Sequence, residues 1–219
     1  MSNRKATIAA LALAVSTSVS IPAIAATAWG GPDNVPTAPV ARVAATTSVE
    51  AADLTFMREE EKLARDVYLK LNEQYDLAIF ANFSGSEQRH MDSLLNLLVK
   101  YRLPDPVAGH AIGVFVDEDL QALYNQLIAA GSTDVASAVR VGGLIEEVDL
   151  EDLNTAAANT TKADVDRVYS NLACGSRNHL RSFAATLKTL TGNAYAAQKL
   201  PQATVDAILA APMERCGRI

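Results

Sequence analysis

The chain has 219 residues, a formal net charge of −6 and a sequence pI of about 5.1. Basic and acidic residues are interspersed, with neither a basic stripe for nucleic acid nor a polybasic membrane patch, so we expect neither partner. Phosphate-binding loops, serine nucleophile motifs and paired Cys-x-x-Cys metal motifs are also absent from the sequence. Function therefore has to be inferred from helical patterns and from the polar residues within them.

The N-terminus has the pattern of a secretory signal peptide. Arg4 and Lys5 precede an apolar run, and Ala23-Ile24-Ala25 is a small-x-small motif typical of signal cleavage after Ala25. We expect residues 1–25 to be removed on export, which places the mature protein in the periplasm, at the cell wall or outside the cell. No membrane span would remain after cleavage. An uncleaved anchor is the alternative, although the apolar run is short for a span.

Composition divides the rest of the chain into three parts. Residues 26–50 are rich in Pro, Ala, Thr and Gly without a period, which predicts a flexible linker. Residues 51–192 carry long helical patterns and are numerous enough for a single core. Residues 193–219 are predicted to form a short helix and a C-terminal tail.

Cys174 and Cys216 are the only cysteines of the chain. In an oxidising compartment, a disulfide between them would join the last long helix to the tail. A loop of that length contributes about 3–4 kcal/mol in the chain-entropy description. The alternative is two free thiols, with Cys174 as a small core residue. We predict the disulfide.

Four long helices are predicted from apolar residues that recur at steps of three and four. Their ranges are 53–75, 81–101, 134–157 and 161–190. Shorter helices are predicted at 118–130 and 204–210. Expected N-terminal caps are Asp53 for the first long helix, Ser132 or Thr133 before the third, and a capping box of Thr161 with Asp164 for the fourth.

Each long helix carries an acid or an imidazole near the centre of its apolar seam. On the second helix, Glu87 and His90 lie between Phe83 and Leu94. The full set is Glu61, Glu87, His90, Glu146 and His179, with Glu60 and Asp149 as less certain members. Two neighbouring acids, Glu59 and Glu147, are expected to face away from the seam.

Burying one ionised carboxylate without a partner costs several kcal/mol, so a bundle with four or five of them needs a cation or mutual pairing. Two divalent metal ions would neutralise the carboxylates and accept the imidazole nitrogens. Side chains three residues apart on a helix lie about 5–6 Å apart, which allows Glu87 and His90 to share such a site. The seams therefore predict a metal centre between the helices.

Short segments of these helices resemble a known superfamily. EKLARDVY at 61–68 and SEQRH at 86–90 are similar to the first-helix and second-helix motifs of rubrerythrin-like members of the ferritin-like proteins. Those bundles place Glu on two helices and Glu-x-x-His on the other two. The likeness favours Glu61 over Glu60. Over about 53–190, the blocks MREEEKLARDVY, SEQRHM, IEEVDLEDL and GSRNHLRSF resemble an uncharacterised bacterial and archaeal ferritin-like family, defined as a domain of unknown function.

This resemblance implies an all-α, ferritin-like four-helix bundle that binds one or two iron ions and oxidises Fe(II) with oxygen or peroxide. One position departs from the pattern, because Ser176 stands three residues before His179 where the superfamily has Glu. Asp149 could replace that carboxylate, or the site could hold one ion or an asymmetric pair. Ser176 would then bond to a bound water.

Two other functions stay open. A non-catalytic helical binding module would use the buried Glu and His residues only to satisfy one another, and a mononuclear zinc or manganese site would accept the same ligands without redox chemistry. Arg65 and Arg177 either pair with ligand carboxylates or are solvated. Tyr68 either packs in the core, which we favour, or places its phenol beside a ligand. Metal ions and a small oxidant are the expected partners, and a homodimer is left open.

Overall fold

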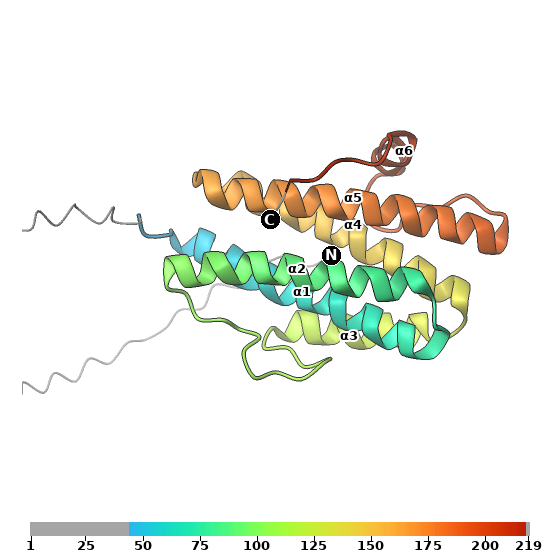
Figure 1. Ribbon diagram of the computed structural model, residues 1–219, viewed down its shortest axis with the longest axis horizontal. Coiled ribbons are helices and arrows are strands. Elements are labelled where there is room, and N and C mark those ends of the chain that lie inside the picture. Colours follow the sequence, from blue (N-terminus) through green and yellow to red (C-terminus); the bar gives the residue numbers. More distant parts are fainter. Residues whose placement is uncertain (1–43, 218–219) are drawn as a thin grey trace, which may run out of the picture. The chain divides into compact units, whose positions relative to one another are not determined.

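The computed structural model describes residues 44–217, and in that range it contains six helices and no strand. The predicted all-α class is confirmed. The four long helices that form the bundle are α1 (Ser48–Tyr75), α2 (Ala78–Tyr101), α4 (Val135–Asn159) and α5 (Ala163–Thr191) (Figure 1). The predicted signal peptide and most of the predicted linker, which ends inside α1, lie outside the described residues.

Two shorter helices lie outside the bundle. Helix α3 (Glu118–Gly131) packs against α1 and α4, and α6 (Gln202–Ala210) packs on the outer side of α5 (Figure 1). Along residues 44–217, none of the helices combines the length and the apolar composition that a membrane span requires.

The long helices form two hairpins. Residues 76–77 join α1 to α2, residues 160–162 join α4 to α5, and one long crossover, residues 102–117 followed by α3, links the hairpins. The Asn159 amide donates a 2.9 Å hydrogen bond to Asp53, which places the end of α4 beside the start of α1. Contacts of α1 with α4 and of α2 with α5 close the bundle.

Helix α1 begins five residues earlier than predicted. The predicted cap, Asp53, lies within the helix, and Thr47 is the N-cap in a capping box with Glu50. The Glu50 amide donates to the Thr47 hydroxyl at 3.1 Å, and the Thr47 amide donates to the Glu50 carboxylate at 2.8 Å. The prediction failed because this polar first turn precedes the apolar repeat.

The predicted caps of the other two helices were also wrong. Asp134 caps α4 by accepting a 2.8 Å hydrogen bond from the Ser137 amide. Helix α5 starts after Lys162 without a side-chain cap. Asp164, which was expected to complete a capping box there, accepts hydrogen bonds from Lys100 and Tyr101 of α2 instead. Donors from a neighbouring helix therefore replace the local interaction.

Close packing explains the two adjacent glycines of α4. A Cβ on Gly142 would lie 2.3 Å from the Phe183 ring, and a Cβ on Gly143 would lie 2.5 Å from the Tyr195 ring. Glycine costs about 1 kcal/mol relative to alanine inside a helix. This cost is offset here by the approach of two buried aromatic rings to the backbone.

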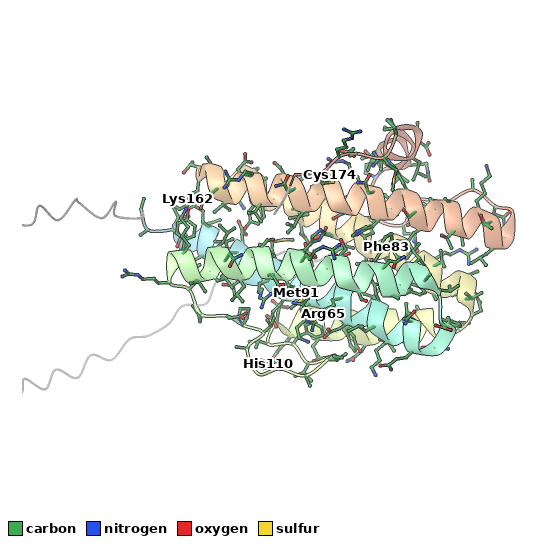
Figure 2. The ribbon with its side chains drawn as sticks, viewed as in Figure 1. Arg65, Phe83, Met91, His110, Lys162 and Cys174 are labelled. Carbon is green, nitrogen blue, oxygen red and sulfur yellow. A yellow bond between two sulfur atoms is a disulfide. The ribbon has the colours of Figure 1, made fainter. Side chains whose placement is uncertain are left out.

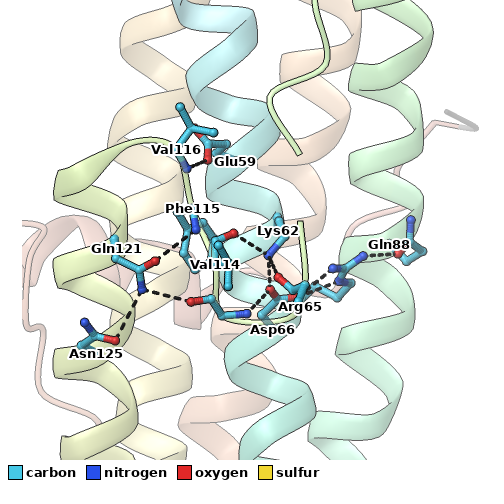
Figure 3. Close-up of polar contacts among 12 residues, drawn as sticks. Glu59, Lys62, Arg65, Asp66, Gln88, Val114, Phe115, Val116, Gln121 and Asn125 are labelled. Atoms are coloured by element: carbon cyan, nitrogen blue, oxygen red, sulfur yellow. Dashed lines mark hydrogen bonds and ion pairs between the residues drawn. The ribbon is translucent and has the colours of Figure 1, made fainter. Parts of the chain in front are cut away.

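The crossover connection is fastened to α1 by buried charges (Figure 3). The Lys62 ammonium, only 1 % exposed, donates to Asp66 at 2.5 Å and to the carbonyls of Ala111 and Val114 at 2.8 and 3.1 Å. The Gly113 amide donates to the Asp66 carboxylate at 2.9 Å. Charged side chains in the middle of α1 thus satisfy the backbone of a segment about fifty residues away.

Glu59 belongs to the same contact and corrects the prediction that it faces solvent. It is 3 % exposed and accepts hydrogen bonds from the amides of Val116 and Asp117 at 2.6 and 3.2 Å. Its carboxylate therefore binds the start of α3. His110 of the connection is exposed (Figure 2).

Glu147 is also buried, although the sequence predicted only that it points away from the seam. It accepts hydrogen bonds from the Tyr195 hydroxyl at 2.7 Å and from the amides of Gln198, Lys199 and Leu200 at 3.0, 2.8 and 2.7 Å. It points away from the bundle centre and holds the segment between α5 and α6 against α4.

The C-terminal tail is attached to α5 by a disulfide and an ionic contact. Cys174, on α5 (Figure 2), is bonded to Cys216, and a loop of 42 residues contributes about 4 kcal/mol in the chain-entropy description. Glu214 accepts hydrogen bonds from Arg177 at 2.5–2.7 Å and from Arg181 at 2.9 Å. The tail is therefore held on the outer side of α5 at two adjacent points.

We predict that Lys62→Met lowers the free energy of unfolding by about 3 kcal/mol, because it removes a buried cation from Asp66, which keeps its bonds to Arg65 and Gly113, and leaves the carbonyls of Ala111 and Val114 without the ammonium donor. Urea unfolding followed by circular dichroism measures the change. Lys70→Met is the matched control on the same helix, since Lys70 pairs with Glu73 at an exposed position and should cost less than about 1 kcal/mol. Equal effects of the two substitutions would contradict the role of Lys62.

A second prediction concerns pH. Hydrogen bonds from Arg177, and then from Arg181, lower the pKa of Glu214 to about 2 from an ordinary 4.5. Its contribution to stability is therefore complete above pH 4.5 and is lost as the pH falls through about 2. The difference in Tm between the wild type and Glu214→Gln should shrink along that interval. A difference that does not depend on pH would contradict this contribution.

Candidate metal centre

The structure brings together the five residues that the sequence selected from four helices. Glu61 comes from α1, Glu87 and His90 come from α2, Glu146 comes from α4 and His179 comes from α5. All are buried, with exposures of 2–6 %. Because the four seams meet at the same level of the bundle, residues from distant parts of the chain form one cluster.

The cluster consists of two groups of potential ligands that share Glu87. In each group, one ligand atom from every residue lies within 4.8 Å of the others, and the groups are Glu61, Glu87 and His90, and Glu87, Glu146 and His179. One Glu87 oxygen lies 2.7 Å from His90 Nδ1, and the other lies 2.9 Å from His179 Nδ1. A carboxylate placed in this way can bridge two metal ions.

Each group is completed by a second carboxylate. Glu61 lies 3.2 Å from His90 Nδ1, and Glu146 lies 3.4 Å from His179 Nδ1. The imidazole rings of His90 and His179 are stacked with centroids 5.9 Å apart, and Phe83 stacks on His179 at 4.0 Å. Aromatic packing therefore fixes one ring, and the carboxylates orient both.

Gly175 of α5 provides the space for the other imidazole. A Cβ at this position would lie 2.8 Å from His90 Cε1 and 2.9 Å from His90 Nε2. The ring of His90 thus packs directly on the backbone of α5. Sequence analysis did not select Gly175, although a glycine four residues before His179 in a long helix is a signal of close approach.

The charges of the cluster depend on one another. Burial acts to raise the pKa of Glu87, but His179 and His90 outweigh it and hold that pKa well below its ordinary value. Burial acts to lower the pKa of His179, but Glu87 and Glu146 raise it to about 10. Burial raises the pKa of Glu61 to about 7 despite the opposing effect of His90. The carboxylates of the cluster therefore strongly stabilise a positive charge beside them.

Several buried oxygens accept no hydrogen bond. Oε1 of Glu61, Oδ1 of Asp149 and both carboxylate oxygens of Glu60 have no donor among the described residues. Buried acceptors without a donor are rare in folded proteins, and one explanation is an ion. Two imidazoles with several carboxylates are a donor set that suits iron, zinc or manganese. The residues present therefore fit a metal ion.

The less certain members of the predicted site lie at its α4 side. Ser176, 1 % exposed, donates a hydrogen bond to Asp149 Oδ2 and another to the Leu172 carbonyl at 3.0 Å. Asp149 therefore reaches the position beside Ser176, where the ferritin-like pattern would have a Glu. Glu60 is buried as well, but neither of the two ligand groups contains it.

The structure decides between the alternatives left open for three neighbouring residues. The Tyr68 hydroxyl donates a 2.5 Å hydrogen bond to Glu146 Oε1, so Tyr68 orients a candidate ligand in addition to packing in the core. Arg65 binds Asp66 and Gln88, and Arg177 binds Glu214, so these bonds hold no candidate ligand. Tyr68 follows Glu61 by seven residues on the same seam. That spacing predicted that Tyr68 faces the core, but not that its hydroxyl bonds to Glu146.

Residues 50–212, which include every candidate ligand, match the family described as uncharacterized protein domain (DUF2202). Uncharacterized protein MJ0754 of Methanocaldococcus jannaschii is 42 % identical over 166 residues, covering 76 % of this chain and 89 % of that protein. The crystal structure of hypothetical protein MJ0754 from Methanococcus jannaschii is similar with a TM-score of 0.76 and 40 % identity, covering 79 % of this chain and 98 % of that chain.

We predict that Gly175→Ala weakens metal binding by about ten- to a hundredfold, the range seen when groups supporting a ligand are changed. The added methyl group displaces the imidazole of His90 from Glu61 and Glu87. Co(II) titration followed by visible absorption measures the effect. Gly85→Ala is the control, because its Cβ would have no neighbour closer than 3.9 Å. Both substitutions raise helix propensity, so weakening in Gly175→Ala alone assigns the effect to His90.

Proposed function

The chain belongs to the family of the uncharacterized protein domain DUF2202, and from its buried cluster we propose an exported ferritin-like protein that binds two iron ions and oxidises Fe(II) with oxygen or peroxide. The observation that carries the proposal is Glu87, whose two oxygens contact the imidazoles of two different ligand groups. A single bridging carboxylate between two such groups is suited to a pair of ions.

The topology supports the ferritin-like part of the proposal. Ferritin-like folds combine four long helices with one long crossover, and their ligands project inward from facing helices. The chain has two hairpins joined by one crossover, residues 102–117 with α3. Its carboxylates and imidazoles come from all four long helices, as the resemblance implies.

Each residue has a distinct role in the proposed centre. Glu61 with His90 would hold one ion, Glu146 with His179 would hold the other, and Glu87 would offer one oxygen to each. Tyr68 fixes the orientation of Glu146, and Ser176 fixes that of Asp149, which supplies a further carboxylate. The aromatic residues Phe80, Phe83 and Phe183 pack on one another beside His179. Iron, when bound, supplies the electrons that reduce oxygen or peroxide.

Export is a separate part of the proposal. The N-terminal residues have the composition of a signal peptide, and the disulfide between Cys174 and Cys216 suits an oxidising compartment. Glu214, which pairs with Arg177 and Arg181, attaches the C-terminal tail to α5 at a second point beside the disulfide. The centre would then act in the periplasm, at the cell wall or outside the cell.

The test is iron content and oxidation. We expect the purified chain, loaded anaerobically with Fe(II), to bind about two ions and to develop a ferric absorption band when oxygen or peroxide is admitted. Glu87→Gln should weaken binding of both ions by at least about a hundredfold, because it removes the shared ligand. Glu73→Gln is the control, since Glu73 is exposed on α1 and pairs with Lys70.

The alternative functions give different results. Metal content at background level would contradict the proposal and favour a helical binding module, in which Glu and His only satisfy each other. One tightly bound ion without an absorption change on oxidation would favour a mononuclear zinc or manganese site. Loss of only one ion in Glu87→Gln would contradict the bridging role.

A further inference from the structure

The C-terminal tail follows one stripe of α5 beside the proposed centre. The residues of this stripe recur at steps of three and four along the helix and are Asn171, Cys174, Asn178 and Arg181. Cys216 is bonded to Cys174, and a Cβ on Gly217 would lie 2.7 Å from the amide oxygen of Asn171, so the tail backbone packs directly on the helix. The stripe spans the same turns of α5 as His179.

Polar contacts hold the tail next to the disulfide. The Glu214 amide donates to Asn178 Oδ1 at 2.9 Å, and Asn178 Nδ2 donates to the Glu214 carbonyl at 3.0 Å and to Cys216 Sγ at 3.4 Å. The Glu214 carboxylate accepts hydrogen bonds from Arg177 at 2.7 Å and from Arg181 at 2.9 Å. The tail is therefore fitted to α5 by its backbone and by a charged side chain as well as by the covalent bond.

The same turn of α5 contacts the proposed centre on its inner side. Gly175, the residue after Cys174, packs on the imidazole of His90, because a Cβ there would lie 2.9 Å from His90 Nε2. The next residue, Ser176, donates a hydrogen bond to Asp149. The disulfide thus fastens the helix one residue away from the point where its backbone approaches a candidate ligand.

The two sulfur atoms differ in their access to solvent. Cys216 is exposed, whereas Cys174 is only 7 % exposed. A thiolate attacks the sulfur that it can reach. The first thiol of a dithiol reductant would therefore bond to Cys216 and release Cys174, and its second thiol would then release Cys216. The reductant supplies two electrons and two protons, so the protein ends with two thiols and the reductant with one disulfide.

We propose that the Cys174–Cys216 disulfide is a thiol-sensitive latch that regulates the metal centre. While it is intact, the tail holds the turn of α5 around Gly175 against His90. Reduction by a dithiol releases the tail at Cys174, loosens this packing and lowers the affinity for metal ions. The effect on metal binding rests on the proposed function, whereas the effect on His90 does not.

The first experiment follows His90 in the metal-free wild type. The chain has three histidines, of which His90 and His179 belong to the cluster and His110 is exposed in the crossover connection. Proton NMR at fixed pH resolves their imidazole signals before and after reduction with dithiothreitol. We expect the His90 signal to shift and that of His110 to stay unchanged. An unchanged His90 signal after complete reduction, verified by thiol titration, would overturn the latch.

The second experiment measures metal affinity without a reductant, which could itself bind the metal. Cys216→Ser removes the disulfide without altering α5, and circular dichroism establishes that the variant is folded. Titration with Co(II), followed by visible absorption, should show binding at least about fivefold weaker than in the wild type, the lower end of typical coupling between sites. Arg215→Gln is the matched control, because Arg215 is exposed in the tail beside Cys216. It should bind Co(II) like the wild type.

The latch and the proposed centre can fail separately. A wild type that binds no Co(II) would contradict the centre, and the NMR comparison of oxidised and reduced wild type would still decide whether the disulfide controls the packing of His90. If the wild type binds Co(II) and Cys216→Ser binds it with the same affinity, the centre stands and its regulation by the disulfide is overturned.

Discussion

The fold depends on how buried negative charge is neutralised at the centre of the bundle. The carboxylates that converge there are Glu60, Glu61, Glu87, Glu146 and Asp149. Two imidazoles, His90 and His179, are the basic groups in contact with them among the described residues. Packing alone cannot compensate for ionised groups in a low-dielectric interior, because each costs several kcal/mol after relaxation. Cations, or protons in their absence, are therefore part of what makes this core stable.

At the level of the buried carboxylates, α1 is held on its inner side by the cluster and on its outer side by the crossover connection. Its inner side carries Glu61, while Glu59, Lys62 and Asp66 bind the backbone of the crossover connection on the outer side. These outer bonds fix the rotation of the helix about its axis. A rotation that moved Glu61 away from Glu87 would break several buried hydrogen bonds at once, so the connection contributes to the geometry of the centre without touching it.

The sequence predicted the helices and the residues of the buried cluster because both are local properties of a repeat. Glu61 and Glu87 stand at seam positions, and a seam can be identified from residues within one helix. Glu59, Lys62 and Glu147 could not be identified in this way, because their partners are backbone groups of segments distant in sequence. Charged residues usually lie at the surface, and nothing local indicates that a connection will cover them.

The asymmetry of the centre follows from one residue of α5. The ferritin-like pattern has a carboxylate at the position of Ser176, but the small hydroxyl side chain instead supports Asp149 from the facing helix. The acids are thereby concentrated on α1 and α4, and both imidazoles lie on α2 and α5. Glu87 alone contacts both imidazoles through different oxygens. The carboxylate beside Ser176 thus comes from α4 instead of α5, so the negative charge of the cluster lies mainly on α1 and α4 while the single carboxylate of α2 faces both imidazoles.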